Sequence, residues 1–445
     1  MQRVIISALW VLCIGISTPL TAQKTNSFSA KQTAEYAAKN SVQVKNALID
    51  VTIQQQSNRE ITSAAFPQIS GSVNVTDYLS IPTNLLPAEF FGGPAGTYIP
   101  VKFGTKYNGS YTARLQQVLF DGQVFVGLQA RRSSITFRQQ TAEVTKEEIK
   151  ANVYKVYYQI VVGKNQIKII DANIARAEKL LHDTRELFKN GFAEQLDVDK
   201  VNVSLSNLRT QKTSVENQLE TGTIGLKYLI GMPVKEQLVL TDSLSDQDLK
   251  DDLLNSSYKY EDRPEYRLQQ TAAILGQYNI KRYQLAYYPT LSFSGTFNRN
   301  AQRNKFNFFD KDKPYFTTSF ISFDLSIPIF DGFARAARVQ QAKLQLQQTQ
   351  ANIANLENSI DNDVQTARVQ IRNAIVTMDE QKKNMALAEQ VYNQTKKKYE
   401  QGLGSNLEIT NAETDLITAQ NNYFSAVYDA IIARIDYLKA VGKLQ

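Results

Sequence analysis

The sequence predicts a mainly α-helical protein that also carries membrane-type β-strands and consists of two copies of one unit. Three observations predict this fold class. A glycine turn at Gly191 recurs at Gly402, 211 residues later. Apolar residues around both turns are spaced alternately by three and four positions, which is the pattern of a coiled coil. Two pairs of short segments alternate apolar and polar residues one by one, as half-exposed strands do.

The two turns match each other residue by residue. The matched pairs are Phe188 and Tyr399, Gly191 and Gly402, Leu196 and Leu407, and Asp197 and Glu408. Self-similarity at a fixed offset indicates a duplicated chain. We therefore expect two structural repeats with the same order of elements.

Residues 1–22 have the pattern of a secretory signal peptide. Arg3 supplies the positive start, an apolar run covers 4–16, and a possible cleavage site ends at Ala22. Cys13, the only cysteine, lies inside the apolar run. We therefore expect an exported protein whose mature form contains no disulfide and no thiol chemistry.

Composition and charge narrow the possible structural class and the possible partners. Only 20 glycines and 11 prolines occur in 445 residues, which favours long helices. The formal net charge of +7 is spread along the chain without a dense basic run, so nucleic acid is not an expected partner. No segment after the signal is apolar enough for a transmembrane helix, so entry into a membrane would have to occur through strands.

The first structural repeat covers 23–233. Its expected elements, in order, are a helix over 29–65, a strand at about 68–79, a loop over 81–104, a strand at about 105–120, a helix N-cap at Asp121 and a coiled-coil hairpin over 122–230. The apolar seam of the hairpin has one misfit, Lys212. An outgoing helix of 67 residues is expected to be roughly 100 Å long.

An acidic linker over 234–261 is expected to separate the repeats, and the second repeat covers 262–445. Its expected elements are a helix from Arg263 to Tyr288, strands at about 290–299 and 316–330, and a coiled-coil hairpin over 332–440. Phe330-Asp331-Gly332 repeats Phe120-Asp121-Gly122 between strand and helix. The same unit is therefore expected twice.

The strands raise the question of what surrounds them. Four amphipathic strands cannot close a membrane barrel alone, because the smallest such barrels have about eight strands. Aromatic residues near the strand ends fit the girdle at a membrane interface: Tyr78, Tyr107, Tyr111, Tyr288, Tyr315 and Phe316. A barrel assembled from several chains fits these features, and a soluble sheet packed on a helix is the alternative.

Several short phrases, in this order and duplicated, carry a family resemblance. They are Arg263-Pro-Glu265, Tyr288-Pro-Thr-Leu-Ser-Phe-Ser-Gly295, Ile327-Pro-Ile-Phe-Asp-Gly332 and Tyr399-Glu-Gln-Gly402. The chain resembles the TolC-like outer-membrane efflux proteins, which serve tripartite efflux and type I secretion systems. The resemblance extends over nearly all of the mature chain.

The resemblance implies an assembly and a location. It implies a homotrimer in which four strands from each chain form one 12-stranded barrel in the outer membrane of a Gram-negative cell. The helices would form a tunnel in the periplasm, and the hairpin tips would meet a periplasmic adaptor and, through it, an inner-membrane pump. The implied function is export of small molecules, and possibly of proteins, without a cofactor, a metal or an enzymatic activity.

The resemblance also implies a gate at the tips. Tyr399 occupies the position of the family's gating tyrosine, and Asp197 that of its hydrogen-bond acceptor. Glu408 and Asn411 occupy the positions of two aspartates that ring the tunnel mouth. Gly404 stands where the family has a gating arginine. A ring of Glu408 carboxylates would favour cations.

Each of these residues also has a structural explanation. Ser405 and Glu408 fit a helix capping box. Tyr399 falls on the coiled-coil seam, where packing alone explains it. Gly191 and Gly402 are explained as helix C-cap glycines. Both explanations stay open for Glu408, since capping and gating are compatible.

The two tips are the expected contact with the adaptor. The residues assigned to that contact are Gly191, Phe192, Ala193, Glu194, Leu196, Gly402, Leu403, Gly404, Ser405 and Leu407. The hypothesis rests on the exposed position expected for a hairpin turn.

Three other functions remain open from the sequence. An enzyme lacks support, because His182 is the only histidine and no nucleophile–base pair or phosphate loop is evident. A periplasmic coiled-coil adaptor also carries long hairpins, although one hairpin with compact β domains is its usual form. A passive outer-membrane pore has no use for long paired hairpins. The sequence does not identify the exported substrate.

Overall fold

The computed structural model describes residues 25–243 and 257–444. The expected signal peptide, over 1–22, and the acidic middle of the expected linker lie outside the described residues. The chain divides into two compact units. The sheet unit consists of Ile49–Gln140 and Arg267–Asn355, and the helical unit consists of the chain up to Leu48, Thr141–Tyr266 and the chain from Leu356.

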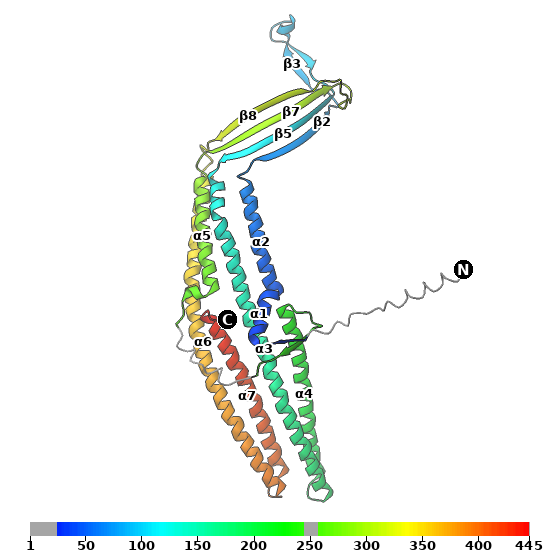
Figure 1. Cartoon of the computed structure of the whole chain (residues 1–445), viewed down its shortest axis with the longest axis vertical. Helices are drawn as coiled ribbons and strands as arrows, with labels where there is room; N and C mark the ends of the chain where they lie inside the picture. Colours follow the sequence, from blue (N-terminus) through cyan, green and yellow to red (C-terminus); the bar gives the residue numbers. More distant parts are fainter. Residues whose placement is uncertain (1–24, 244–256, 445) are drawn as a thin grey trace, which may run out of the picture. The chain divides into compact units, whose positions relative to one another are not determined.

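The sheet unit is organised around four antiparallel strands (Figure 1). Their order is β2 (Gln68–Asp77), β5 (Tyr107–Phe120), β7 (Thr290–Arg303) and β8 (Phe316–Ser326). The central pair, β5 and β7, joins the first repeat to the second, and a register shift interrupts it between Val118 and Phe120. Because β2 and β8 pair on one side only within the described chain, each leaves an edge with unpaired backbone groups.

The register places apolar side chains from all four strands on one face of the sheet. Ile69 pairs with Leu115, Leu115 with Gly295, and Gly295 with Ile321. We call this the apolar face; its large apolar members are Ile69, Val73, Val75, Leu115, Leu291, Phe293, Phe297, Ile321, Phe323 and Leu325. Most of these side chains are exposed in the single chain, so the sheet presents an apolar surface to its surroundings.

The strand ends differ most from the expected ones in two places. β7 continues to Arg303 because its polar residues from Asn300 onward pair with the start of β5. β8 ends at Ser326, before the expected end at 330, and Pro328 follows two residues later. A proline has no N–H to give to a strand ladder, which explains the earlier end.

The expected loop over 81–104 is wrong in part, because it contains a second small sheet. β3 (Thr83–Pro87) pairs antiparallel with β4 (Tyr98–Lys102), and the 3₁₀ helix η1 (Ala88–Phe91) connects them. The four prolines of this segment pointed to a loop. Pro87 and Pro100 fit here because an isolated two-strand hairpin consists of edge strands only.

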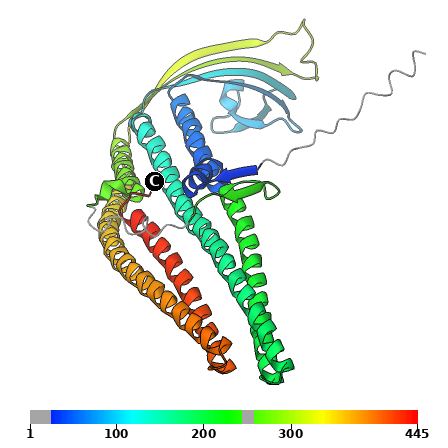
Figure 2. The same ribbon diagram turned by 60° about the horizontal axis from the view of Figure 1, so that its bottom comes forward.

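The helical unit contains two long hairpins, seen from a second direction in Figure 2. The first is α3 (Gly122–Lys189) with α4 (Gln195–Ile230), and the second is α6 (Ala334–Glu400) with α7 (Asn406–Ala440). The first part of α3 and of α6, most of α2 (Val42–Ser63) and most of α5 (Pro264–Leu285) belong to the sheet unit. The 3₁₀ helix η2 (Tyr260–Asp262) precedes α5.

The expected continuous helix over 29–65 is interrupted at Ser41, which separates α1 (Ala30–Asn40) from α2. Ser41 is extended, with ψ at 144°, and its hydroxyl accepts from the Val44 N–H at 3.3 Å. The end of α4 reaches this break: a Cβ on Gly231 would lie 2.3 Å from the Asn40 carbonyl oxygen. The break therefore makes room for a neighbouring helix end, which apolar spacing alone does not reveal.

A small parallel sheet was also missed by the sequence. β1 (Thr25–Phe28) pairs with β6 (Gln237–Leu240), a segment inside the expected linker. Buried Tyr157 ties this sheet to α3, since its hydroxyl donates to the Phe28 carbonyl at 3.0 Å and accepts from the Asp242 N–H at 3.2 Å. Four-residue strands are too short to show a period-two pattern.

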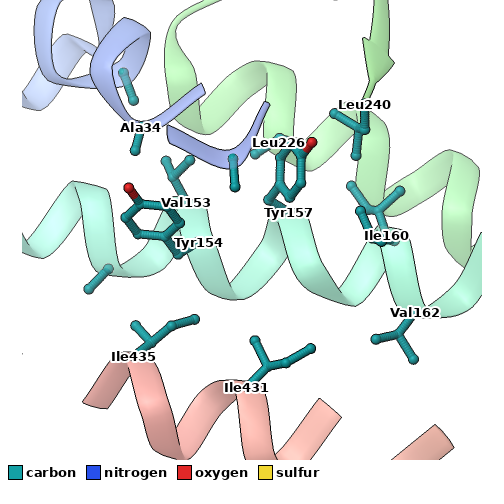
Figure 3. Packing of buried hydrophobic residues seen from close by; sticks show 14 of the residues in the cluster. Ala34, Val153, Tyr154, Tyr157, Ile160, Val162, Leu226, Leu240, Ile431 and Ile435 are labelled. Carbon is teal, nitrogen blue, oxygen red and sulfur yellow. The ribbon is translucent and has the colours of Figure 1, made fainter. Parts of the chain in front are cut away.

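The main core of the helical unit surrounds the middle of α3 (Figure 3). Tyr157 and Ile160 point toward Leu226 of α4 and Leu240 of β6. Ile431 and Ile435 of α7 lie on the opposite side of α3. The middle of α3 therefore packs against its own hairpin partner α4 on one side and against α7 of the second hairpin on the other.

Candidate functional site at the hairpin tips

The two hairpin turns have the same backbone geometry. Gly191 has φ +78° and Gly402 has φ +72°. In the first turn the Phe192 N–H donates to the Leu187 carbonyl at 2.8 Å, and in the second the Leu403 N–H donates to the Lys398 carbonyl at 2.9 Å. This is the Schellman arrangement, in which a left-handed residue ends the helix. Glycine is required because other residues adopt positive φ only with strain.

The return helices begin with related but different caps. Glu194 precedes α4, and its N–H donates to Asp197 Oδ2 at 3.2 Å. Ser405 precedes α7, and its hydroxyl accepts from the Glu408 N–H at 3.2 Å. The Ser405 half of the expected capping box is therefore present. Among the described hydrogen bonds, none joins the exposed Glu408 side chain to the Ser405 N–H, so the Glu408 half is not formed.

Two polar contacts join the first hairpin tip to the second. The Asn406 side-chain amide donates to Asp197 Oδ1 at 2.9 Å and to the Asp197 carbonyl at 3.3 Å. The Tyr399 and Thr184 hydroxyls lie 3.2 Å apart. Asn406, Thr184 and Tyr399 are all buried. The contact between Tyr399 and Thr184 is therefore shielded from water, whereas the other joins the buried Asn406 amide to the half-exposed Asp197. A buried polar group that loses its partner is costly.

This arrangement differs from the one that the resemblance implied. Tyr399 was expected to donate to Asp197, but the hydrogen bonds of the described residues connect Tyr399 to Thr184 and Asp197 to Asn406. Asp197 also holds the start of its own helix through the Glu194 N–H. Gly404 stands where the resemblance implied an arginine, and Asn406 is the residue that reaches across.

The tip contacts are set in an apolar cluster. We call it the tip cluster; its buried members are Ala177, Leu180, Leu181, Val198, Val201, Leu205, Leu208, Tyr392, Tyr399, Ile409, Ala412 and Leu416. All four long helices contribute to it. Packing is therefore part of the role of Tyr399, as its seam position predicted, and its hydroxyl adds a polar contact.

Glu408 and Asn411 lie on an exposed side of α7. Asp415, also exposed, follows at the spacing that continues this stripe, since residues i, i+3 and i+7 share one helix face. The stripe therefore carries two carboxylates, although Asn411 is neutral. The resemblance pointed to Glu408 and Asn411 only, so Asp415 was not predicted from the sequence.

A cleft of about 970 Å³ lies between the tips. Its lining includes more acids than bases: Asp183, Glu186, Glu194, Asp197 and Glu400 against Lys200. Beside the cleft, Phe192 is 81% exposed and its counterpart Leu403 is 78% exposed. Leu196 and Leu407, another matched pair, are also exposed. Each tip thus offers two apolar side chains at equivalent positions.

A buried polar network lies further along the same helices. Asn173 of α3 donates to Gln420 of α7 at 2.8 Å, and Arg176 donates to Asn173. The Arg176 guanidinium stands 5.6 Å from the Tyr392 ring centre. Glu413 is 3% exposed, and its Oε1 has no hydrogen-bond partner in the described structure. Burial raises the pKa of Glu413 above its ordinary value, and Arg176 opposes this rise.

A half-buried carboxylate, Glu265, has the opposite electrostatics. Arg263 donates to both oxygens of Glu265, at 3.2 and 3.3 Å, and to the Ala440 carbonyl at the end of α7 at 3.2 Å. Burial of Glu265 tends to raise its pKa, but the Arg263 hydrogen bonds and charge hold that pKa below its usual range. The Arg263-Pro264-Glu265 phrase therefore fastens the start of α5 to the end of α7.

Three residues of the site were not predicted from the sequence: Thr184, Asn406 and Glu413. Thr184 was visible only as a polar residue on the apolar seam. Glu413 falls one position after the seam residue Ala412, and nothing in its spacing distinguishes it from a surface residue. These side chains are buried because the two hairpins approach each other, which the residue spacing does not reveal.

Two features are absent from the described residues. Across 25–243 and 257–444, no helix is long and apolar enough to cross a membrane. In the same ranges no group of three or more histidine, cysteine, aspartate or glutamate residues could hold a metal ion.

Known proteins that resemble this chain include outer-membrane efflux proteins and channels. The family model described as outer membrane efflux protein matches residues 265–443. Outer membrane efflux protein BepC of Brucella suis is 20% identical, over 96% of this chain and 88% of its own length. Outer membrane protein TolC of Salmonella enteritidis is also 20% identical, over 75% of this chain and 69% of its own length.

A solved structure is similar over nearly the whole chain. The Campylobacter jejuni CmeC outer membrane channel superposes with a TM-score of 0.72, over 93% of this chain and 85% of that one, at 16% sequence identity. This likeness shows the fold, in which long helices accompany a β domain. The family model itself lies within the second repeat.

Proposed function

Because the chain is a TolC-like outer-membrane efflux protein, we propose that it forms the outer-membrane channel of an export system. The channel carries small molecules, or proteins, from a periplasmic pump and adaptor complex to the cell exterior. It performs no chemistry of its own. Its working form is a homotrimer that extends from the outer membrane into the periplasm.

The four-stranded sheet is the observation that carries this proposal. Most of its apolar face is exposed in the single chain, and within the described residues both β2 and β8 have a free edge. Exposed edges invite pairing with another chain, and an outward apolar face suits lipid. Three copies of a four-stranded sheet supply 12 strands, enough to close a barrel.

The hairpin tips are the proposed contact with the adaptor. The assigned residues around Gly191 and Gly402 are exposed or half-exposed, and they include the four apolar side chains at matched positions. A partner that covered Phe192, Leu196, Leu403 and Leu407 would bury apolar area at both tips. The acidic lining of the cleft favours basic residues on that partner.

The contacts between the tips are the proposed gate. Asn406 with Asp197 and Tyr399 with Thr184 hold the second hairpin to the first. Glu408 and Asp415 give the neighbouring helix face a negative charge. Parting of the tips would break both contacts together, and adaptor binding would then stabilise the parted state.

Substitution of the turn glycines tests the adaptor contact. Valine at Gly191 and Gly402 would strain a left-handed backbone by roughly 1–2 kcal/mol per site, although neither site is crowded. We expect dye efflux to be abolished while outer-membrane fractionation and trimer amount stay normal. Gly225→Val is the matched control, because Gly225 lies inside α4 in open space. Retained efflux in the double variant would contradict the tip assignment.

A further inference from the structure

The apolar face changes character at the end of the sheet where β5 begins and β7 ends. There the register pairs Tyr111 with Arg299 and Tyr107 with Arg303 across β5 and β7, the two central strands in Figure 1. The alternation places these four residues on the same face as Phe297 and Leu115. We call Lys106, Tyr111, Arg299, Arg303 and Tyr315 the basic rim.

Two guanidinium groups share one aromatic ring in the basic rim. The Arg299 guanidinium lies 5.3 Å and that of Arg303 5.6 Å from the centre of the Tyr315 ring. Tyr315 is held in place, since its hydroxyl donates to the Phe308 carbonyl at 2.5 Å and its ring lies 5.8 Å from that of Tyr111. An aromatic ring attracts a nearby cation, but it carries no net charge. The positive charges of both guanidinium groups therefore remain.

The structure fixes Arg303 more firmly than a surface arginine. Arg303 is 8% exposed and donates to the Gln302 carbonyl at 3.0 Å and the Pro314 carbonyl at 2.6 Å. Its Nε is buried without a hydrogen-bond partner. Arg299 is exposed, so it presents its donors to whatever lies outside the sheet.

The positive charge of the rim is not balanced. Among the residues that the structure describes, no carboxylate forms an ion pair with Arg299 or Arg303. The rim's one ion pair joins Lys106 to Asp77 at 3.9 Å. Three cations against one anion leave a net charge of +2 on this part of the face. Two like charges held together favour an anion between or beside them.

We propose that the basic rim binds the phosphate headgroup of an anionic lipid in the outer leaflet. The proposal rests on the proposed function, because only a membrane barrel turns the apolar face toward lipid. Phe297 and Ile321, further along that face, would then meet the acyl chains. An arginine fork suits phosphate because it gives two parallel hydrogen bonds, and arginine is tolerated on a lipid-facing strand near the interface.

The rim's position along the strands supports a headgroup. Aromatic residues concentrate where a barrel leaves the hydrocarbon, and Tyr107, Tyr111 and Tyr315 gather here. Phe308 covers Gly109, where a Cβ would lie 2.7 Å from the Phe308 ring. The segment after β7 therefore folds over the end of the apolar face and holds the basic rim at a fixed position along the strands.

The test measures lipid binding by the intact protein in detergent. The probe is bis-phosphorylated lipid A, compared with the same lipid after removal of its phosphates and with inorganic phosphate. Native mass spectrometry counts the lipids retained by the wild type, by Arg299→Gln and by Arg114→Gln. Arg114 is the matched control, because it is exposed on the opposite, polar face of the same sheet.

The expected result is retention of the phosphorylated lipid by the wild type and by Arg114→Gln, with about tenfold weaker retention by Arg299→Gln, since one charge-assisted arginine fork is lost. Equal loss in Arg114→Gln would overturn the proposal, as would equal binding of the dephosphorylated lipid. Displacement of the lipid by millimolar inorganic phosphate would assign the site to the free ion instead.

Failure of the proposed function gives a different result. Outer-membrane fractionation and dye efflux are measured for the wild type from the same cells. If the wild type exports dye but retains the phosphorylated and the dephosphorylated lipid equally, the proposed lipid site is wrong and the proposed channel function stands. A wild type absent from the outer membrane overturns the channel, whatever lipid it retains in detergent.

Discussion

The two hairpin tips arose from one unit, and they differ where they touch each other. Both turns use a left-handed glycine and the same backbone hydrogen bonds. Both present two exposed apolar side chains. In the second tip, however, Tyr399 is 9% exposed, whereas its counterpart Phe188 is 41% exposed. Asn406 is buried against Asp197, whereas its counterpart Gln195 is exposed and donates to Asp199 of its own helix.

This asymmetry separates two roles that a single tip would combine. The shared features lie on the outside of the turns, where one partner could recognise both copies. The divergent residues face the other hairpin, and the second copy supplies the side chains that reach across. Each divergent position therefore has a natural control, namely the matched residue 211 positions away.

The largest expected effect comes from Asn406→Ala. A hydrogen bond to a charged group is worth about 1.5–3 kcal/mol, so its loss would favour the parted tips by roughly 10- to 150-fold. Single-channel recordings in planar bilayers should then show frequent opening without an adaptor. Gln195→Ala removes the matched, exposed amide and should leave the recordings unchanged. Equal opening in both variants would contradict the asymmetry.

Tyr399→Phe should have a smaller effect of the same sign. It removes the hydroxyl contact with buried Thr184, a neutral hydrogen bond worth about 0.5–1.5 kcal/mol, and leaves the packing of the ring intact. Spontaneous opening should increase roughly two- to tenfold by the same recordings. Phe188→Tyr adds a hydroxyl at the exposed counterpart and should change nothing. An effect of Phe188→Tyr as large as that of Tyr399→Phe would contradict this prediction.

Glu413 extends the comparison, because its counterpart Asn202 is exposed. Its pKa is raised by burial, so the folded state binds the proton more tightly than the unfolded state. Stability is therefore greatest below the ordinary pKa of 4.5, and it falls as pH rises through the interval up to the raised value. Glu413→Gln removes this titration.

Thermal unfolding measures the effect of Glu413→Gln. Relative to wild type, the variant should gain stability on the order of 1 kcal/mol above that interval and little at acid pH. Asn202→Ala is the control for the exposed position. Glu265→Gln should behave oppositely, because its lowered pKa contributes stability that is lost as pH falls. A gain from Glu413→Gln that does not depend on pH would refute the titration.

The most local effect is expected from Ser405→Ala at the start of α7. Loss of an N-cap hydroxyl costs roughly 0.5–2 kcal/mol, and an exposed helix end can fray without wider change. Ser405→Gly should cost only a few tenths of a kcal/mol. Hydrogen exchange of the first turn of α7 is the measurement. Equal protection in the alanine variant and the wild type would show that the cap does not hold the tip.

The sequence predicted the repeats, the long helices and the turns, because each has a local signature. Glycine at a helix end, alternating three-four spacing and strict alternation all act through neighbours a few residues apart. The missed features depend on distant segments. β1 pairs with β6 across more than 200 residues, and Ser41 breaks a helix because the end of α4 approaches it. Asn406 and Glu413 are buried by a hairpin from the other repeat.

A reversible crosslink tests the central claim, that export requires the two tips to part. The single cysteine, Cys13, lies in the expected signal peptide, so Asp197→Cys with Asn406→Cys places one reactive pair in the mature chain. Dye efflux is measured in cells before oxidation, after oxidation and after added reductant. The account predicts that oxidation stops efflux and that reduction restores it, with the trimer amount unchanged. Undiminished efflux through a channel that is fully crosslinked, as judged by gel mobility, would contradict it.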